Sequence, residues 1–534
     1  MKKNYKKIVF LAFIFGVIVY SLLRFSSSQD AIASNTVKSN PVTFKMRLTG
    51  EPETLDWNLA HTMIESYLLM NLMEGLVTFD RELNVIPNLA EKWKVSDDGK
   101  TYTFYLKKDV LWSDGVPLTA QHFLYSWKRL LSPLTAASYA YFLFDVVGAK
   151  EFNSGELKDF KKVGIKTLDD HTFQVELKKP IAHWISIPSF WVTFPLRKDV
   201  VSKHGSAWPK PGRMVTVGPF TLSSYDIGSK IVLTENKNYH RKKGNIQKIV
   251  AQIVQDDSTA LNLYEVGKLD FLTDISTIDL KRLQGREDLK SFSYLKTGYL
   301  GFSVNRYPIT NVHLRKAIAM AIDKSKIGAI LHGGQKPARS FIPPPLFSSS
   351  NTLGYSFDPK SAKRELSKAG WDSTTPLKLE LLTSNWDKSL TLTQFIQGQL
   401  KQNLGLDVSI QPYDHKSFRA QLDLHVYSSF LLSWGADFPD PDNFLSVFLS
   451  RSGNNRTTWK NSDYDELVYK ARALKDKKKR EEAYISAQKI LLNDDVVIVP
   501  LYYEPNMALV NKKVRGIFIN PMNYLFLRDV YVGS

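Results

Sequence analysis

Residues 93–106 read WKVSDDGKTYTFYL, and apolar and polar side chains alternate on both sides of the Asp98-Gly99 pair. A period of two places alternate side chains on one face of a strand. Glycine tolerates the positive φ of a tight turn, so Asp98-Gly99 predicts the turn of an antiparallel hairpin. Residues 166–177 (KTLDDHTFQVEL) predict a second hairpin of similar design.

Helical patterns follow along the chain. Thr119 precedes apolar residues at helical spacing, and Pro133 should end that helix. Further helices are predicted at 311–327, from 358 to 370, and over 463–492 as one or two helices. A buried strand is expected at 496–503. This mixture predicts an α/β or α+β fold with several sheets and more than one lobe.

The composition is that of a globular protein. The chain has 534 residues, which suggests roughly three or four domain-sized units. Hydrophobic residues are 43% and charged residues 23%, which excludes a disordered chain, a fibre and a many-span membrane protein. There is no Cys, so disulfides, thiol nucleophiles, Cys-bound zinc and a lipidated N-terminal cysteine are excluded.

Residues 1–33 have the pattern of an export signal. Residues 1–7 are basic, residues 8–23 form an apolar run, and Ala31-Ile32-Ala33 matches a small-residue cleavage site. An uncleaved inner-membrane anchor is the alternative, although the apolar run is slightly short for a membrane span. Either way, we expect the remaining chain to lie outside the cytoplasm, in the periplasm.

The formal charge of +18 does not indicate a nucleic-acid partner. Lys and Arg are spread along the chain, and the densest run, at 475–480, falls in a predicted helix. A nucleic-acid reader gathers its charge into a stripe or patch. We therefore expect a solvated basic surface and no nucleic-acid binding.

Motifs for catalysis and cofactor binding are missing. The sequence has no Walker loop, G-x-G-x-x-G, G-x-S-x-G or H-E-x-x-H motif, and its ten His residues are scattered singly. A pair of carboxylates that meet only in space would escape this search. We expect no enzyme activity, no cofactor and no metal.

The most informative stretch for function is residues 432–444, LSWGADFPDPDNF. A surface turn is one interpretation, because Asp and Pro are common in turns. Against it, Asp437 lies between Ala436 and Phe438 and close to Trp434. A carboxylate held among aromatic groups is poorly solvated and favours a cationic partner such as an ammonium group. A calcium loop is disfavoured, since the required Gly and terminal Glu are absent.

The chain resembles the oligopeptide-binding proteins, family 5 solute receptors of peptide/nickel-type ATP-binding-cassette importers. The most specific segments are 87–104 (PNLAEKWKVSDDGKTYTF) and 112–120 (WSDGVPLTA). The resemblance covers essentially all of 41–534. It implies an α/β, two-lobed fold like that of periplasmic binding proteins (type II, cluster C), with an extra third domain.

By this resemblance, residues 41–73, 198–296 and 505–534 form lobe I, residues 74–197 form the extra domain, and residues 297–504 form lobe II. Two chain crossovers would act as the hinge. The ligand would lie between the lobes and be enclosed when they close. The implied partners are short peptides and an inner-membrane permease, and we expect a monomer.

The resemblance also implies the site residues. An Asp at the position of Asp437 pairs with the ligand α-amino group, and the main chain of Ser433 and Gly435 pairs with the ligand backbone. Trp434 would form the wall of a side-chain pocket and Tyr139 would line the cleft, although both could simply be core residues. The other candidate ligand-binding residues are His61, Met63 and Asn455.

Departures from the family pattern leave the substrate open. His61 replaces an acidic residue, residues 430–433 contain no Arg, and residues 381–393 contain no His. Lys388, Arg419 or solvent could hold the ligand carboxylate. The alternative to an oligopeptide is another solute on the same fold: a dipeptide, a murein peptide, an opine, a nickel chelate or an oligosaccharide.

Overall fold

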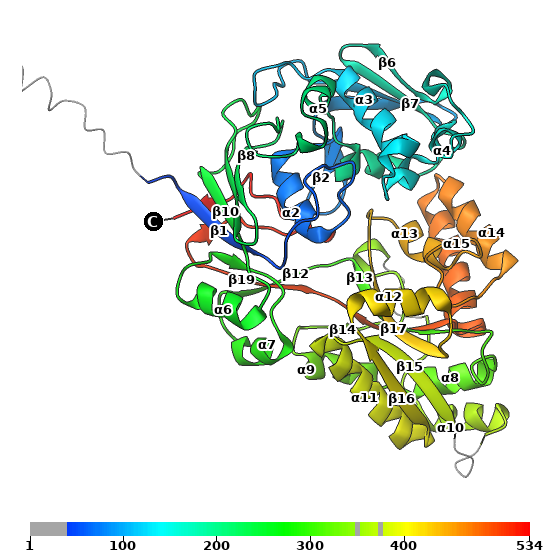
Figure 1. Cartoon of the computed structure of the whole chain (residues 1–534). Coiled ribbons are helices and arrows are strands. Elements are labelled where there is room, and N and C mark those ends of the chain that lie inside the picture. Colours follow the sequence, from blue (N-terminus) through cyan, green and yellow to red (C-terminus); the bar gives the residue numbers. More distant parts are fainter. Residues whose placement is uncertain (1–39, 348–352, 372–376, 534) are drawn as a thin grey trace, which may run out of the picture. The chain divides into compact units, whose positions relative to one another are not determined.

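The computed structural model describes residues 40–347, 353–371 and 377–533. Its compact units are Met1–Val42 and Thr43–Ser534. The predicted export signal and its apolar run lie outside the described residues. The second unit contains the sheets and helices (Figure 1).

The largest sheet has seven strands, and Figure 1 shows its main strands together beside α6 and α7. In spatial order the strands are β12 (Leu289–Phe292), β19 (Asn506–Val510), β11 (Phe271–Leu272), β1 (Thr43–Leu48), β10 (Lys248–Ile253), β9 (Lys230–Glu235) and β8 (Phe220–Asp226). The central pair β1 and β10 is parallel, and β9 and β8 continue the sheet in antiparallel fashion.

The second sheet has six strands and is built from a later part of the chain. In spatial order they are β14 (Lys336–Pro337), β18 (Ile498–Tyr503), β13 (Lys296–Phe302), β17 (Ser429–Gly435), β15 (Lys378–Ser384) and β16 (Asp407–Tyr413). Every residue of β18 is buried, as expected for the apolar run at 496–503.

Both predicted hairpins are confirmed, and they pair with each other to form a four-stranded sheet. Its order is β4 (Ala90–Val95), β5 (Thr101–Leu106), β7 (Thr172–Glu176) and β6 (Ile165–Asp169). Gly99 has φ of 74°, the left-handed conformation that the turn requires. The remaining strands form two small ribbons, β2 (Val77–Phe79) with β3 (Val85–Pro87), and β20 (Val514–Arg515) with β21 (Tyr531–Val532).

Helices cover the sheets. They are α2 (Met63–Leu72), α3 (Ala120–Leu131), α4 (Ala149–Asn153), α5 (Lys198–His204), α6 (Asp257–Glu265), α7 (Thr277–Leu283), α8 (Val312–Ala321), α9 (Ile327–Leu331), α10 (Pro359–Lys368), α11 (Asp387–Leu404), α12 (His415–Leu424), α13 (Pro441–Leu445), α14 (Ser462–Ala473) and α15 (Lys477–Lys489). The predicted helices between Thr119 and Pro133, from 358 to 370 and over 463–492 are confirmed, the last as two helices.

The predicted helix at 311–327 is shorter than expected. It ends at Ala321, because Ile322 is extended and Asp323 caps a new 3₁₀ turn by accepting a hydrogen bond from Ser325 N. Apolar periodicity continues past this break into α9, which explains why the pattern alone predicted one helix.

The chain passes twice between the seven-stranded and six-stranded sheets. Residues 293–295 connect β12 to β13, and residues 504–505 connect β18 to β19. The two crossovers touch, since Glu504 N donates to the Lys296 carbonyl at 2.9 Å. These short paired connections are the positions where the predicted hinge would lie.

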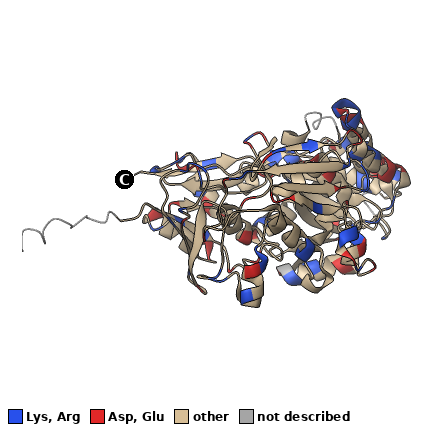
Figure 2. Cartoon of the chain, turned by 90° about the horizontal axis from the view of Figure 1, so that it is seen from above, with Lys and Arg blue, Asp and Glu red and all other residues tan. Residues whose placement is uncertain are grey.

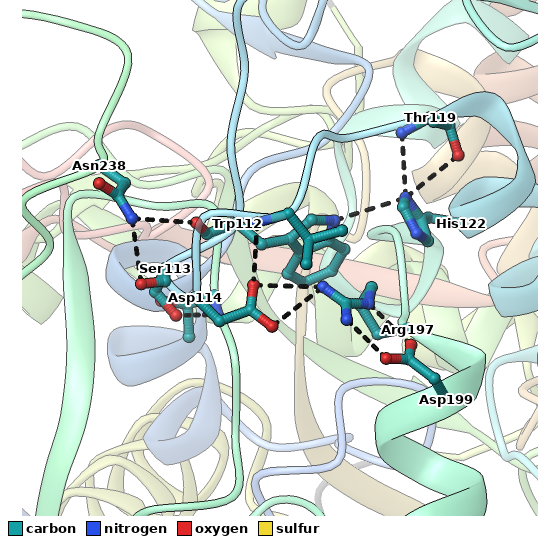
Figure 3. A network of polar contacts seen from close by, with 10 residues as sticks. Trp112, Ser113, Asp114, Thr119, His122, Arg197, Asp199 and Asn238 are labelled. Atoms are coloured by element: carbon teal, nitrogen blue, oxygen red, sulfur yellow. Dashed lines mark hydrogen bonds and ion pairs between the residues drawn. The ribbon is translucent and has the colours of Figure 1, made fainter.

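The conspicuous WSDG motif at 112–115 has a structural use (Figure 3). Asp114 accepts two hydrogen bonds from Arg197, whose guanidinium also binds Asp199, at 2.5 and 2.7 Å, and lies over the Trp112 ring. Burial lowers the pKa of His122 to about 4, so its neutral Nδ1 accepts from Thr119 N and Trp112 Nε1. Asn238 then binds the main chain at 112 and 113. The motif therefore fastens the four-stranded region to the chain around the seven-stranded sheet.

Charged residues are interspersed rather than gathered. Figure 2 shows that basic and acidic residues are both spread over many elements, with no single basic stripe in the view. This pattern agrees with the expected solvated surface. Several of the largest side chains are instead fully buried as core, among them Trp57, Trp112, Trp127, Trp184 and Trp208.

Candidate functional site

The segment after β17 contains three aspartates with different environments. Asp440 caps α13 and forms an ion pair with Arg480, at 2.7 Å. Asp442, 2% exposed, forms an ion pair with Arg472 at the same distance. Among the described residues, Asp437 has no ion-pair partner, and the polar group beside its carboxylate is the Asn443 amide. Asp440 and Asp442 are therefore buried ion-pair partners at the start of α13 rather than residues of a surface turn, whereas Asp437 has no cationic partner among the described residues.

Asp437 is half-buried, and its electrostatic environment is unusual. Burial raises its pKa to about 7, against a smaller opposing effect of the Asn443 amide. Asn443 also fixes the local backbone, because its Oδ1 accepts from Asp437 N and from Trp434 Nε1. A carboxyl group with this pKa and no cation nearby would gain strongly from a bound ammonium group.

Tyrosines from distant segments surround Asp437. Burial, and then the field of Asp437, raises the pKa of Tyr139, Tyr141 and Tyr524. Tyr294, from the first crossover, lies within the same field, and its pKa is also raised, chiefly by burial. Polarisable rings and neutral hydroxyls near one acid form a setting that suits a cation.

Two cavities adjoin this region. One, of about 550 Å³, contains Asp437, Trp434 and Phe438 and is closed on its other side by Tyr141 and Phe142. Phe438 also stacks on His183, with ring centroids 4.6 Å apart and planes at 9°. The cavity thus lies between the four-stranded region and the loop that follows β17 of the six-stranded sheet. A small ligand there would contact both.

The second cavity, of about 800 Å³, lies between the seven-stranded and six-stranded sheets. Met63 and Tyr67 of α2 line one side, and Trp386 and Lys388 at the start of α11 line the other. Tyr294 lines this cavity and also lies in the field of Asp437. The two cavities are therefore neighbours along the same interface.

The end of β17 has an open edge. Ala436 N donates to the Leu295 carbonyl, so even-numbered residues of β17 direct their main-chain groups toward β13. Ser433 and Gly435 consequently direct theirs toward the opposite edge. On that edge the pairing with β15 includes only Ser429 and Phe430. Among the described residues, no strand pairs with Ser433 or Gly435 there.

The structure brings five of the predicted site residues together. Asp437, Trp434, Ser433 and Gly435 are contiguous, and Tyr139 joins them from the four-stranded region, packed against Phe142, Phe190 and Trp191. Tyr139 is half-buried, so it belongs both to that aromatic cluster and to the surroundings of the acid.

The other three predicted residues lie elsewhere. Met63 lines the larger cavity. His61 is exposed, 3.5 Å from Glu53, and its main chain binds Glu65. Asn455 uses its amide internally: Nδ2 donates to carbonyls of 448, 449 and 459, and Oδ1 accepts from Thr457.

Sequence reasoning missed Tyr141, Tyr294 and Lys296. Tyr141 carried a signal in the sequence, because it follows Tyr139 by two residues. Tyr294 and Lys296 had none, since their position depends on the register of β13 against β17.

Two further searches concern only the described part of the chain. Within residues 40–347, 353–371 and 377–533, no cluster of three or more His, Cys, Asp or Glu side chains is suited to hold a metal ion. Over the same residues, no helix has both the length and the apolarity to span a bilayer.

Comparisons with known proteins confirm the resemblance and the fold class. The chain is 31% identical to a probable deoxycholate-binding periplasmic protein, YgiS, of Escherichia coli, covering 94% of this chain and 96% of that one. It is 30% identical to the periplasmic oligopeptide-binding protein OppA of Salmonella typhimurium, covering 90% and 91%.

Solved structures agree with these relatives. The unliganded open form of the murein tripeptide-binding protein MppA matches with a TM-score of 0.78 and 27% identity, over 92% of this chain and 98% of that one. Haemophilus influenzae OppA in complex with the peptide RPPGFSPFR matches with a TM-score of 0.77 and 27% identity, over 93% and 100%. The α/β, two-lobed periplasmic-binding-protein fold is thereby confirmed.

A family model, Bacterial extracellular solute-binding proteins, family 5 Middle, matches residues 84–456. With these matches, the chain belongs to the bacterial extracellular solute-binding proteins of family 5.

Proposed function

We propose that this protein is an extracytoplasmic receptor that binds short peptides between its lobes and delivers them to an inner-membrane ATP-driven importer. The observation that supports this most strongly is Asp437: a half-buried carboxylate without a cation, surrounded by aromatic rings and adjoining the open edge of β17. It offers a place for the one positive group that unmodified peptides share.

The open edge supports recognition of the ligand backbone. An extended peptide can add beside Ser433 and Gly435 as an extra strand, and its main-chain hydrogen bonds do not depend on side-chain identity. Ligand side chains would then occupy the neighbouring cavities, where water can fill unused space. Trp434 forms a wall of one such pocket.

The remaining parts of the proposal follow from the same fold. Lobe I (41–73, 198–296 and 505–534), the extra domain (74–197) and lobe II (297–504) would close about the crossovers at 293–295 and 504–505. The receptor is exported to the periplasm, acts as a monomer without enzyme activity, and hands its ligand to a permease.

A second candidate ligand is an anionic amphiphile related to deoxycholate. One relative is named as a probable deoxycholate-binding protein. The larger cavity favours such a ligand, because apolar side chains including Met63, Ile64, Leu280 and Met507 line it beside basic groups.

The test is binding measured by calorimetry on the exported form of the protein. A tripeptide with a free N-terminus should bind, and its N-acetylated form should bind much more weakly. Asp437→Asn should remove most of this difference. Mass spectrometry of ligands that co-purify with the native protein distinguishes peptides from amphiphiles. Equal binding of free and acetylated peptides by the wild type would contradict the role of Asp437.

A further inference from the structure

Lys296 is the first residue of β13 and lies at the crossover between the two sheets. Its half-buried side chain lines the larger cavity, with Nζ 5.5 Å from the centre of the Tyr294 ring. Among the described residues, its ammonium group makes no hydrogen bond and has no acid within ion-pair distance. The three N–H donors of this ammonium group therefore have no hydrogen-bond acceptor among the described residues.

The other basic groups that line this cavity are already paired. Arg47 Nη2 lies 2.6 Å from Asp257. Lys388 forms an ion pair with Glu504, and Gln335 Nε2 donates to the other oxygen of Glu504 at 3.1 Å. Both oxygens of Glu504 are thus occupied, which leaves Lys296 as the open cation of the set.

Lys296 keeps its charge in this position. Burial alone would lower its pKa, but the fields of Tyr294, Glu504 and Asp274 outweigh that effect and raise it. Asp274 is exposed and lies beyond ion-pair distance, so it supports the charge without occupying the donors. A bound anion would find a charged and incompletely solvated partner.

The open cation begins β13, and the open acid follows the end of the neighbouring strand β17 by two residues. Lys296 pairs directly with Gly435, two residues before Asp437, so their Cα atoms are roughly 8–9 Å apart from strand geometry. An extended peptide of two or three residues spans roughly 7–11 Å between its ends. Both side chains thus start from one end of the same strand pair, where the two ends of a short zwitterion could reach them.

We propose that Lys296 binds the carboxylate of the ligand, so that the cleft selects short ligands with both an ammonium and a carboxylate group. This inference rests on the proposed receptor function of the same cleft. It resolves the alternatives left by the sequence: Lys388 is occupied by Glu504, and Arg419, on α12, lines neither cavity.

The test compares Ala-Ala-Ala with Ala-Ala-Ala amide by calorimetry at pH 7.5. Hydrogen bonds to charged groups predict that amidation weakens binding to the wild type by roughly 10- to 100-fold. In Lys296→Met the two peptides should bind almost equally. Lys296→Arg, which keeps the charge, should retain discrimination. Lys290→Met, at an exposed position on β12, is the matched control and should behave as wild type.

Further arms identify the source of the carboxylate and separate the two proposals. If Ala-Ala-Asp amide binds as tightly as the free acid, and only when Lys296 is present, the lysine takes a side-chain carboxylate. N-acetylation tests Asp437 independently of Lys296. If no peptide binds, the proposed peptide function fails. A comparison of deoxycholate with its uncharged amide then still tests whether Lys296 binds a carboxylate. A wild type indifferent to amidation in all ligands, or a Lys296→Met variant that still discriminates, would overturn the inference.

Discussion

Affinity for a ligand with a free amino group should depend on pH through Asp437. Burial raises the pKa of this carboxyl to about 7 in the ligand-free protein. Binding an ammonium group requires the ionised form, so binding releases a proton whenever the carboxyl begins protonated. The affinity must then decrease as the pH falls below 7, where the competent fraction becomes small.

The size of the effect follows from two titrations. At pH 5 only about 1% of Asp437 is ionised, compared with about 70% at pH 7.4. The ligand α-amino group has a pKa of about 7.8 and is itself about 70% protonated at pH 7.4. The product of the two fractions has its maximum near pH 7.4 and is roughly 50-fold smaller at pH 5.

The assay is calorimetry with a neutral tripeptide from pH 5 to pH 8.5 at constant ionic strength, in buffers of different ionisation enthalpy. The buffers report the proton released on binding. Asp437→Asn is the control, because an amide does not titrate; its weaker affinity should stay nearly constant between pH 5 and pH 7. The N-acetylated peptide should likewise lose the acidic dependence.

A wild-type affinity that is unchanged between pH 5 and pH 7 would refute the reasoning. So would an Asp437→Asn variant that keeps the same acidic decrease, since another group would then be titrating. Loss of the native circular dichroism signal of the ligand-free protein over the same pH range would show that low pH acts on the fold rather than on the site.

Three further predictions concern stability. Without ligand, the raised pKa of Asp437 means that its contribution to folding is present at low pH and is lost as the pH rises through about 7; Asp437→Asn should therefore unfold at a higher temperature than wild type at pH 8, and equal melting temperatures there would oppose this. Arg472→Met leaves the buried Asp442 without its ion-pair partner and should cost about 3–5 kcal/mol in urea unfolding, whereas Lys512→Met at the exposed pair with Glu287 should leave the urea midpoint nearly unchanged; similar losses would contradict the difference. An added Cβ at Gly244 would lie 1.9 Å from the Val530 carbonyl, so Gly244→Ala should destabilise by about 1–3 kcal/mol, while Gly398→Ala, in open space within α11, should stabilise by about 0.5–1 kcal/mol; the reverse order in urea midpoints would show that packing at Gly244 is not limiting.

Local patterns predicted the local structure well. The hairpin at Asp98-Gly99 and the helix after Thr119 depend on turn chemistry and on periodicity within a few residues, and both are present. The helix at 311–327 was predicted too long, since the cap at Asp323 competes with a pattern that remains apolar beyond it.

The candidate site could be predicted from the sequence only in part. The aromatic neighbours of Asp437 in sequence drew attention to it, and its role stays a prediction. Asp440 and Asp442 have similar neighbours in the sequence. They differ from Asp437 because Arg480 and Arg472, on two helices distant in the sequence, form ion pairs with them. Lys296 could not be predicted as a site residue for the same reason, because its position near Asp437 depends on which strand pairs with β13.

An exposed strand edge is ordinarily a hazard, because a second copy of the protein can extend it into an aggregate. The unpaired stretch beside Ser433 and Gly435 is too brief to begin a new sheet, and Asp437 follows directly after it. A long polymerising strand would have to carry its backbone past that acid. The short edge thus offers room for one short extended ligand of the kind proposed, and it discourages self-association.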